Sequence, residues 1–454
     1  MTKSIRLPLL TGSLLASLLA SQTPSLHAAD ALPPDARVAI IGDSITEQKL
    51  YSKFMEAYLV ACTGRPDIKV FQFGWGGETA SGFAGRLEND LGAFQPTVAT
   101  TCYGMNDGGY RPFDEGVGKN YETAMRTVVN KLAAAGVKHI VVGTPGAVDT
   151  KYFGPRASFG TGNSADGYNN SLAQLGAIGR KLATENNQGF ADVHGAMIDA
   201  MTKAKAALGE NYDVCGKDGF HPGANGHLIM AYAFLKALGV DGNIGEITVD
   251  LRGETTATGG HKVLGKVFGA GVEIESSRYP FCFDADPKSS ASTRSITPFF
   301  PFNQDLNRFT LKVKNLTAAK AKVTWGRVRY EFTKEELKDF GATGGGIIKQ
   351  ETKEFTKEQL EAGVNLAAEF PSTPFDEAFG KVLGAIAAKQ NFETTMIKGV
   401  ITGFRNLPAE VKNDTEVAAA LVTIRKRLGA RQEALGAEVR KALVPVKHTI
   451  TVAH

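Results

Sequence analysis

The sequence lacks several patterns that mark other classes of protein. Beyond its N-terminal segment no run of about 18 apolar residues occurs, the length that a membrane-spanning helix needs, which predicts a soluble mature chain. Lys and Arg form no long basic run and the net charge is only +4, so no nucleic-acid partner is expected. No zinc-like spacing, phosphate-binding loop or dinucleotide fingerprint is present, and we therefore expect neither metal nor cofactor.

Cysteine is also scarce. The 454 residues contain four, none of them in a CxxC motif: Cys62, Cys102, Cys215 and Cys282. Four cysteines allow three full disulfide pairings, and the sequence does not choose among them. Cys62 falls in an expected helix and Cys102 in an expected strand, so both also fit as buried thiols.

The first 29 residues have the features of a secretory signal peptide. Lys3 and Arg6 give a charged start, Leu9 to Leu19 is largely apolar, and Ser25 to Ala29 ends in small residues suited to cleavage. A buried N-terminal helix is the alternative, which the short apolar run at the extreme terminus disfavours. We expect an exported protein, periplasmic or extracellular, without an integral membrane segment after signal removal.

Strand and helix patterns alternate from residue 36 to 240. The expected strands are 38–41, 68–73, 98–103, 140–142 and 190–193. The expected helices are 51–62, 80–94, 121–135, 168–185, 196–208 and 227–238. This alternation predicts an α/β domain over residues 30–244, with a parallel sheet in the order 2-1-3-4-5 covered on both faces.

The pattern changes near residue 245. It predicts a small antiparallel β module, a linker or insertion, a helical hairpin and a terminal strand, at residues 245–332, 333–371, 372–444 and 445–454. The insertion is inferred from a near-repeat, in which Glu331 to Leu337 recurs as Glu354 to Leu360. Pro408 breaks the first long helix, and Asp414 is placed to cap the second.

Two aromatic clusters lie within the expected β module, at Tyr279–Phe283 and Pro298–Phe302. Platforms on which sugar rings stack are one interpretation of such clusters. Packing of the β module against the α/β domain is the favoured one, because large aromatic side chains dominate the burial of apolar surface.

Three motifs lie at the carboxyl ends of the first three expected strands. Ser44 follows Gly42-Asp43, Gly77 closes a glycine-rich block, and Asn106 lies in a Gly-Met-Asn-Asp-Gly turn. Each motif alone is an ordinary turn or helix cap. Ligands of doubly wound sheets bind at the carboxyl ends of adjacent strands, so Ser44, Gly77 and Asn106 are expected to converge.

A fourth motif, Asp218-Gly219-Phe220-His221-Pro222, precedes the last helix of the α/β region. A serine nucleophile needs a base, and the base needs a carboxylate that fixes its tautomer. The spacing of three residues places Asp218 and His221 within one turn of each other. His194 is the rival base, although it has no Asp in a partner motif.

Together the four motifs resemble those of the SGNH hydrolases, the GDSL-type esterases, over about residues 36–240. The resemblance implies a flavodoxin-like α/β/α fold and ester hydrolysis by Ser44, His221 and Asp218. It also implies an oxyanion hole formed by the backbone N–H groups of Ser44 and Gly77 and by the Asn106 side chain.

The resemblance has one departure and one extension. Related sequences often have Asn near the start of the second block, where Gln72-Phe73 stand here, which affects local support rather than a catalytic group. The later region resembles the C-terminal extension of some exported bacterial members, most strongly at Glu361 to Ala367.

Substrate contacts are expected from Asp107, Tyr110, Arg111 and His194, although Arg111 fits equally well as a solvated loop charge and His194 fits better as a structural residue. The expected function is an exported serine esterase that removes short acyl groups, acetyl above all, from a carbohydrate. A small acylated molecule or a polysaccharide is the expected partner. One alternative is a lysophospholipase or lipase, but the sequence shows no strongly basic amphipathic helix of the kind that binds a membrane surface. The other is a non-catalytic glycan-binding protein on the same fold.

Overall fold

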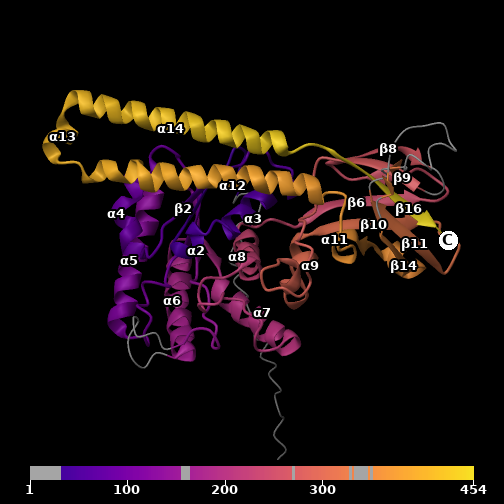
Figure 1. The fold of residues 1–454 in the computed structure, drawn as a ribbon, viewed down its shortest axis with the longest axis horizontal. Helices are drawn as coiled ribbons and strands as arrows, with labels where there is room; N and C mark the ends of the chain where they lie inside the picture. Colours follow the sequence, from indigo (N-terminus) through magenta and orange to yellow (C-terminus); the bar gives the residue numbers. More distant parts are fainter. Residues whose placement is uncertain are drawn as a thin grey trace, which may run out of the picture.

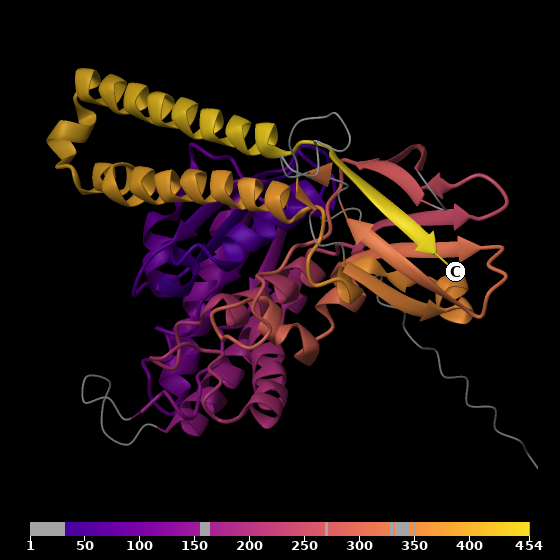
Figure 2. The same ribbon diagram turned by 45° about the vertical axis from the view of Figure 1, so that its right-hand side comes forward.

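The computed structural model describes residues 32–154, 164–267, 271–326, 330–331, 346–347 and 351–453. The expected signal peptide, residues 1–29, lies outside the described residues. An α/β domain and a β module lie side by side, and two long helices run along the α/β domain toward the module (Figures 1 and 2). Among the described helices, none is both long and apolar enough to span a bilayer.

The α/β domain is built on a five-stranded parallel sheet in the predicted order β2-β1-β3-β4-β5. Its strands are Arg37–Gly42, Lys69–Gly74, Val98–Cys102, His139–Gly143 and Gly189–Ala191 for β1 to β5. Successive side chains of a strand point to opposite faces, and both faces are buried. Val38 and Ile40 thus join one core, and Ala39 and Ile41 join the other.

Helices cover both faces of this sheet, which confirms the predicted three layers. One core contains apolar side chains of α3 and its π-helical continuation η1, of α7 and of α8 (Tyr51–Ala57, Tyr58–Cys62, Val193–Leu208, Ala224–Ala237). The other contains side chains of α4, α5 and α6 (Ala80–Leu91, Glu115–Ala134, Ala165–Glu185). A single turn, α2 (Ser44–Glu47), follows β1 directly.

The β module consists of two sheets and a short extra pair. The first sheet has the order β15-β10-β6-β7 (Val364–Asn365, Arg308–Lys314, Asn243–Asp250, Thr256–Ala257). The second has the order β14-β11-β16-β9-β8 (Glu351–Thr356, Lys320–Gly326, Val446–Ala453, Gly271–Ser276, His261–Val267), and β12 (Tyr330–Glu331) pairs with β13 (Gly346–Ile347). The pairs are antiparallel except β6 and β10, whose parallel pairing the long connection between them permits.

Part of the expected linker at 333–371 is integral to this module. β14 pairs with β11 and β15 with β10, and the short helices α10 (Lys357–Ala362) and α11 (Leu366–Glu369) lie beside β10. The linker prediction is therefore wrong for residues 351–371. The second copy of the near-repeat has a structural role there, because Phe355 is buried and Thr356 forms a capping box with Gln359.

The aromatic clusters join the two parts of the molecule. The ring centroid of Phe281 lies 5.9 Å from that of Phe54 in α3 and 5.2 Å from that of Phe302 in α9 (Phe302–Leu306). The 3-10 helix η3 (Arg294–Phe299) precedes α9. Phe281 and Phe302 are almost fully buried. These rings pack the β module against the α/β domain, which is the interpretation that the sequence analysis favoured over a sugar-stacking platform. All four cysteines carry free thiols.

The long helices are α12 (Asp376–Gly399) and α14 (Thr415–Ala442), connected by η4 (Ile401–Asn406) and α13 (Ala409–Asn413). The Asp414 side chain accepts hydrogen bonds from Glu416 N and Val417 N, which confirms the predicted cap. After α14 the chain returns to the module as β16, which pairs with β9 and β11.

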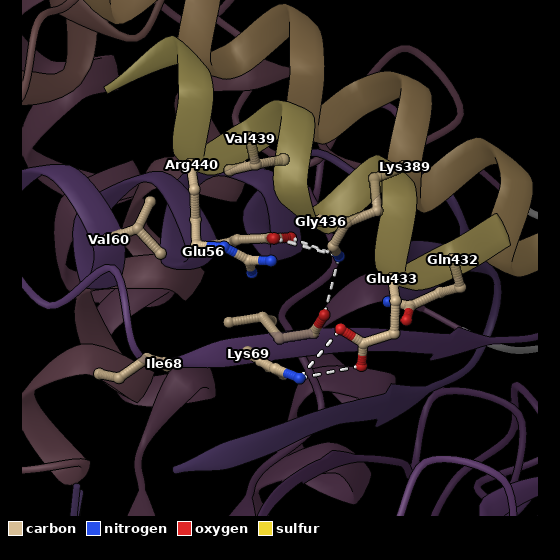
Figure 3. Close-up of a pocket in the computed structure, with 11 residues that line it drawn as sticks. Glu56, Val60, Ile68, Lys69, Lys389, Gln432, Glu433, Gly436, Val439 and Arg440 are labelled. Atoms are coloured by element: carbon tan, nitrogen blue, oxygen red, sulfur yellow. Dashed lines mark hydrogen bonds and ion pairs between the residues drawn. The ribbon is translucent and has the colours of Figure 1, made fainter. Parts of the chain in front are cut away.

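A buried charge cluster fixes α12 against the α/β domain, and Figure 3 shows two of its members, Lys389 and Glu56. Lys389 Nζ lies 3.1 Å from Glu56 of α3 and 2.8 Å from Glu393, and donates to the Val70 carbonyl at 2.7 Å. Burial opposes a charge on Lys389, but Glu393 and Glu56 outweigh it and raise the pKa of the ammonium. Burial raises the pKa of Glu56 to about 7. Gln432 of α14 donates to Glu393 at 2.8 Å, so the cluster also contacts the second long helix.

Replacing Lys389 by Met is expected to lower the free energy of unfolding by about 3–5 kcal/mol, because it leaves two buried carboxylates without their cation. Urea denaturation followed by circular dichroism measures the change. Lys381→Met is the matched control, since Lys381 lies on the same helix in an exposed ion pair with Glu377. That variant is expected to stay within about 0.5 kcal/mol of the original protein. Equal stabilities of the two variants would refute the role given to the cluster.

Candidate active site

Loops after β1, β2 and β3 meet at one edge of the parallel sheet. The register places Gly42 beside both Gly74 and Cys102, so the three strands end level with one another. Ser44, Gly77 and Asn106 follow these ends, which is the arrangement that the strand-end motifs predict.

Ser44 is the first residue of α2, and Asp43 shapes the turn that presents it. The Asp43 side chain accepts a hydrogen bond from Ile45 N at 2.9 Å and is almost fully buried. Burial raises the pKa of Asp43 to about 7, against the effect of that hydrogen bond. Asp43 therefore supports the turn that presents Ser44.

Ser44, His221 and Asp218 form a continuous hydrogen-bonded chain. Ser44 Oγ lies 2.8 Å from His221 Nε2, and His221 Nδ1 lies 2.7 Å from Asp218 Oδ2. These distances suit a nucleophile, a base and a carboxylate that orients the base. Gly219, between the two acid–base residues, has a φ of +89°, and a Cβ there would lie 2.3 Å from Phe153 N. The tight turn that joins Asp218 to His221 thus requires glycine.

The Asp218 carboxylate is held ionised by its hydrogen bonds. Its Oδ1 accepts from His221 N at 2.9 Å and from Phe220 N at 3.1 Å. Burial acts to raise the pKa of Asp218, but the imidazole and the two backbone donors outweigh burial and lower it to about 2. A permanently charged carboxylate stabilises an imidazolium that forms on His221.

The second and third loops supply groups suited to an oxyanion. Gly77 is exposed and has a φ of +71°, a conformation that glycine adopts without strain. Asn106 Nδ2 donates to the Glu78 carbonyl at 3.0 Å, and its Oδ1 accepts from Tyr110 Oη at 3.0 Å. These bonds fix the orientation of the amide. Because an amide nitrogen carries two N–H groups, Asn106 retains one for a substrate oxygen.

A buried ion network holds this part of the site from behind, and the sequence analysis missed it. Arg86 of α4 donates to both carboxylate oxygens of Glu78, at 2.6 and 2.7 Å, and to Asp90 at 2.9 Å. Tyr103 Oη donates to Glu78 at 2.7 Å. The backbone carbonyl of the same Glu78 receives the Asn106 amide. An arginine on the buried face of α4, three residues after Phe83, is the signal that could have revealed the network.

Asp107, expected to contact substrate, has a different role. Its Oδ1 accepts from Ala80 N at 2.9 Å and its Oδ2 from Gly104 N at 3.0 Å. Burial raises the pKa of Asp107 to about 6, although these backbone donors act to lower it. With both oxygens engaged, the side chain ties the loop after β2 to the loop after β3.

Tyr110 and Arg111 differ in their position at the site. The Tyr110 ring lies 5.3 Å from those of Tyr168 and Phe220, and the Phe220 ring lies 4.4 Å from that of His221. Tyr110 thus forms part of an aromatic wall behind the base. Arg111 is exposed and pairs with Asp114 at 3.1 Å, so the structure places it in a solvated loop.

His194, the rival base, does not join Ser44. Its Nδ1 lies 3.0 Å from the Gly146 carbonyl, and its backbone N–H donates to Thr144 Oγ1 at 2.7 Å. The side chain is buried, and burial lowers its pKa. These contacts anchor the start of α7 to the loop after β4 and explain the position of His194 without a substrate contact.

His227 of α8 supports the segment that follows Ser44. Tyr51 N donates to its Nδ1 at 3.2 Å, and Nε2 lies 2.9 Å from Gln48 Oε1. The imidazole is fully buried and stacks on Tyr51. Burial above all, with a smaller effect of His221, lowers the pKa of His227 to about 3. The folded protein therefore holds this ring neutral, as both hydrogen bonds require.

The chain is similar to known ester hydrolases in sequence and to a solved enzyme in fold. Residues 40–229 match the GDSL-like Lipase/Acylhydrolase family. An acetylxylan esterase of Geobacillus stearothermophilus is 27% identical over 199 residues, which are 42% of this chain and 81% of that protein. A solved gut microbial diltiazem-metabolizing enzyme is 21% identical, with a TM-score of 0.67 over 94% of this chain and 99% of its own. The likeness to that structure shows that the fold, including the β module and hairpin, is shared.

Acidification is expected to destabilise the protein partly through His227. Its pKa falls from 6.5 to about 3 on folding, so the contribution to stability is complete above pH 6.5 and declines as pH falls toward 3. Between pH 7.5 and 4.5 this group alone accounts for about 2–3 kcal/mol. Urea midpoints at both pH values for the original protein and His227→Gln measure it. The variant should lose less stability over this interval, and an equal loss would contradict the assignment.

Proposed function

We propose that this chain, which contains an SGNH (GDSL-type) hydrolase domain and is a carboxylic ester hydrolase, is exported and removes short acyl groups, acetyl above all, from carbohydrate. The observation that carries the proposed chemistry is the hydrogen-bonded chain from Asp218 through His221 to Ser44.

In the first half-reaction Ser44 Oγ attacks the ester carbonyl while His221 Nε2 takes the hydroxyl proton. The carbonyl oxygen becomes negatively charged and accepts hydrogen bonds from the backbone N–H groups of Ser44 and Gly77 and from Asn106 Nδ2. The ionised Asp218 carboxylate stabilises the imidazolium. When the tetrahedral intermediate collapses, the ester C–O bond breaks, the alcohol takes the proton from His221, and the acyl group stays on Ser44.

Water completes the second half-reaction. His221 removes a proton from a water molecule, the resulting hydroxide attacks the acyl-serine carbonyl, and the same donors hold the oxyanion. Collapse releases the carboxylic acid and returns the proton to Ser44 Oγ. The cycle consumes one ester and one water and restores the hydrogen-bonded chain.

Three observations support a short acyl group on a carbohydrate. The relative from Geobacillus stearothermophilus is named an acetylxylan esterase, and the signal-like residues 1–29 would deliver the enzyme to a compartment where polysaccharides occur. Gly76 and Gly77 are exposed, so the oxyanion loop faces an open surface that a polymer can approach. A lipase or lysophospholipase would need an apolar acyl groove, which progressively favours longer chains.

Ser44→Ala is expected to lower turnover of p-nitrophenyl acetate by about 10⁴-fold or more, because loss of one triad member removes most of the rate enhancement. Asp218→Asn, which preserves the shape of the site, should lose a similar amount because it favours the wrong tautomer of His221. Thermal unfolding must show both variants folded. A folded Ser44→Ala variant that retains a tenth of the original turnover would exclude Ser44 as nucleophile, whereas an original protein without ester turnover would favour the glycan-binding alternative.

Catalytic efficiency is expected to peak at the two-carbon ester in a series of p-nitrophenyl esters from two to twelve carbons. Each buried methylene of an acyl groove would contribute about 0.8 kcal/mol and raise efficiency with chain length. Acetate release from acetylated xylan and other acetylated glycans, assayed in parallel, identifies the alcohol component. A steady rise toward twelve carbons would reject the short-acyl proposal and favour the lipase alternative.

A further inference from the structure

The end of α12 reaches the loop that carries Gly77. Lys398 Nζ, in the last turn of this helix, lies 2.5 Å from Glu47 Oε1. The other oxygen, Glu47 Oε2, accepts a hydrogen bond from Gly76 N at 2.5 Å. Glu47 is also the last residue of α2, which begins with Ser44. One side chain from the C-terminal hairpin is thus connected through a carboxylate to both the nucleophile turn and the glycine loop.

We propose that Lys398 is a positioning residue for ester hydrolysis, acting through Glu47 on the oxyanion loop. It holds the Glu47 carboxylate on the Gly76 N–H, and it balances a negative charge close to the place where the oxyanion forms. The proposal rests on the ester hydrolysis proposed above. Neither the family match, which ends at residue 229, nor the strand-end motifs include this residue.

The charge balance is needed because of what Gly77 does in the reaction. An uncompensated carboxylate near a developing oxyanion raises the energy of the transition state, since like charges repel. Glu47 and Lys398 are each about one quarter to one third exposed, at 25% and 30%, so solvent screens their charges only partly. Lys49 is a nearby cation, but its ammonium donates to the Glu47 backbone carbonyl at 2.7 Å rather than to the carboxylate.

Cations from two helices hold Trp75 in the same loop. Lys398 Nζ lies 4.7 Å from the centroid of the indole ring, and Arg86 Cζ lies 4.9 Å from it. Cation–π attraction of this kind is worth about 0.5–1 kcal/mol at exposed sites and more where it is desolvated. The loop between β2 and α4 is therefore clamped by α12 as well as by the buried network of Arg86.

Gln72, the residue that departs from the family pattern, sets the register of α12 for this contact. Its backbone N–H donates to Glu393 at 3.1 Å, and its Oε1 accepts from Thr394 Oγ1 at 3.2 Å. Its Nε2 donates to the Thr46 carbonyl within α2 at 2.7 Å. Because one side chain bridges α12 and α2, the last turn of α12 delivers Lys398 to Glu47 with little freedom.

The test compares kcat and KM of Lys398→Met with those of the original enzyme on p-nitrophenyl acetate. We expect kcat to fall about tenfold with KM changed less than about twofold, below the 10²–10³-fold cost of losing a whole oxyanion donor. Lys398→Arg should restore most of kcat. Lys381→Met, an exposed substitution on the same helix, should leave both constants unchanged. Thermal unfolding of each variant identifies any loss of fold.

Glu47→Gln combined with Lys398→Met separates charge balance from simple packing. The amide oxygen of Gln can still accept from Gly76 N, and the negative charge is gone, so the double variant should exceed Lys398→Met in kcat. Original kcat in Lys398→Met, or a double variant no faster than Lys398→Met, would overturn the proposal while an inactive Ser44→Ala leaves the esterase mechanism standing. An active Ser44→Ala would instead reject the mechanism itself.

Discussion

The hydrogen bond between Ser44 and His221 joins segments 177 residues apart in the sequence, and the rest of the structure determines whether it forms. On one side, β1 must end level with its neighbours so that the tight turn at Asp43 presents the hydroxyl. On the other, the Asp218–His221 turn must precede α8 in a fixed position. The packing of α8 on α3 and the bonds of His227 to Tyr51 and Gln48 connect the two sides. The active site is thus a consequence of helix packing on one face of the sheet.

Buried charge is used twice to fix positions around this contact. Arg86 with Glu78 and Asp90 orients the loop that carries Gly77, and Lys389 with Glu56 and Glu393 fixes the hairpin. Apolar replacements of similar volume could be as stable as such clusters, because desolvating the ions is costly. A cluster tolerates only arrangements in which every charge keeps its partner, however, whereas apolar surfaces can slide. The charge clusters therefore contribute to the precise placement of these elements more than to stability.

The sequence permitted prediction of the features that depend on local pattern. Strand-end motifs identified the edge of the sheet where Ser44, His221 and Asp218 meet, and alternation identified the strand that becomes β16. The sequence pattern did not reveal that Asp107 and His194 make structural hydrogen bonds rather than the expected substrate contacts. Tertiary packing sets the partners of both side chains. The near-repeat at 354–360 was misjudged for the same reason: β14 and α10 gain stability from β11 and β10, and nothing in their own composition reports this. Lys398 was beyond reach, since its partner lies 351 residues away.

The order in which the chain visits its two parts places the hairpin between the β module and the α/β domain. The chain leaves the α/β domain at β6, builds most of the β module, crosses back as α12, and returns through α14 to end as β16 between β9 and β11. Both ends of the hairpin therefore meet the module (Figures 1 and 2). Ion pairs of Lys389 with Glu56 and of Lys398 with Glu47 fix α12 to the α/β domain. Through Lys398 and Glu47 the same helix also contacts the loop that carries Gly77. Because a neighbour of known structure shares this arrangement over 94% of the chain, the extension is part of one architecture with the hydrolase domain rather than an attached module.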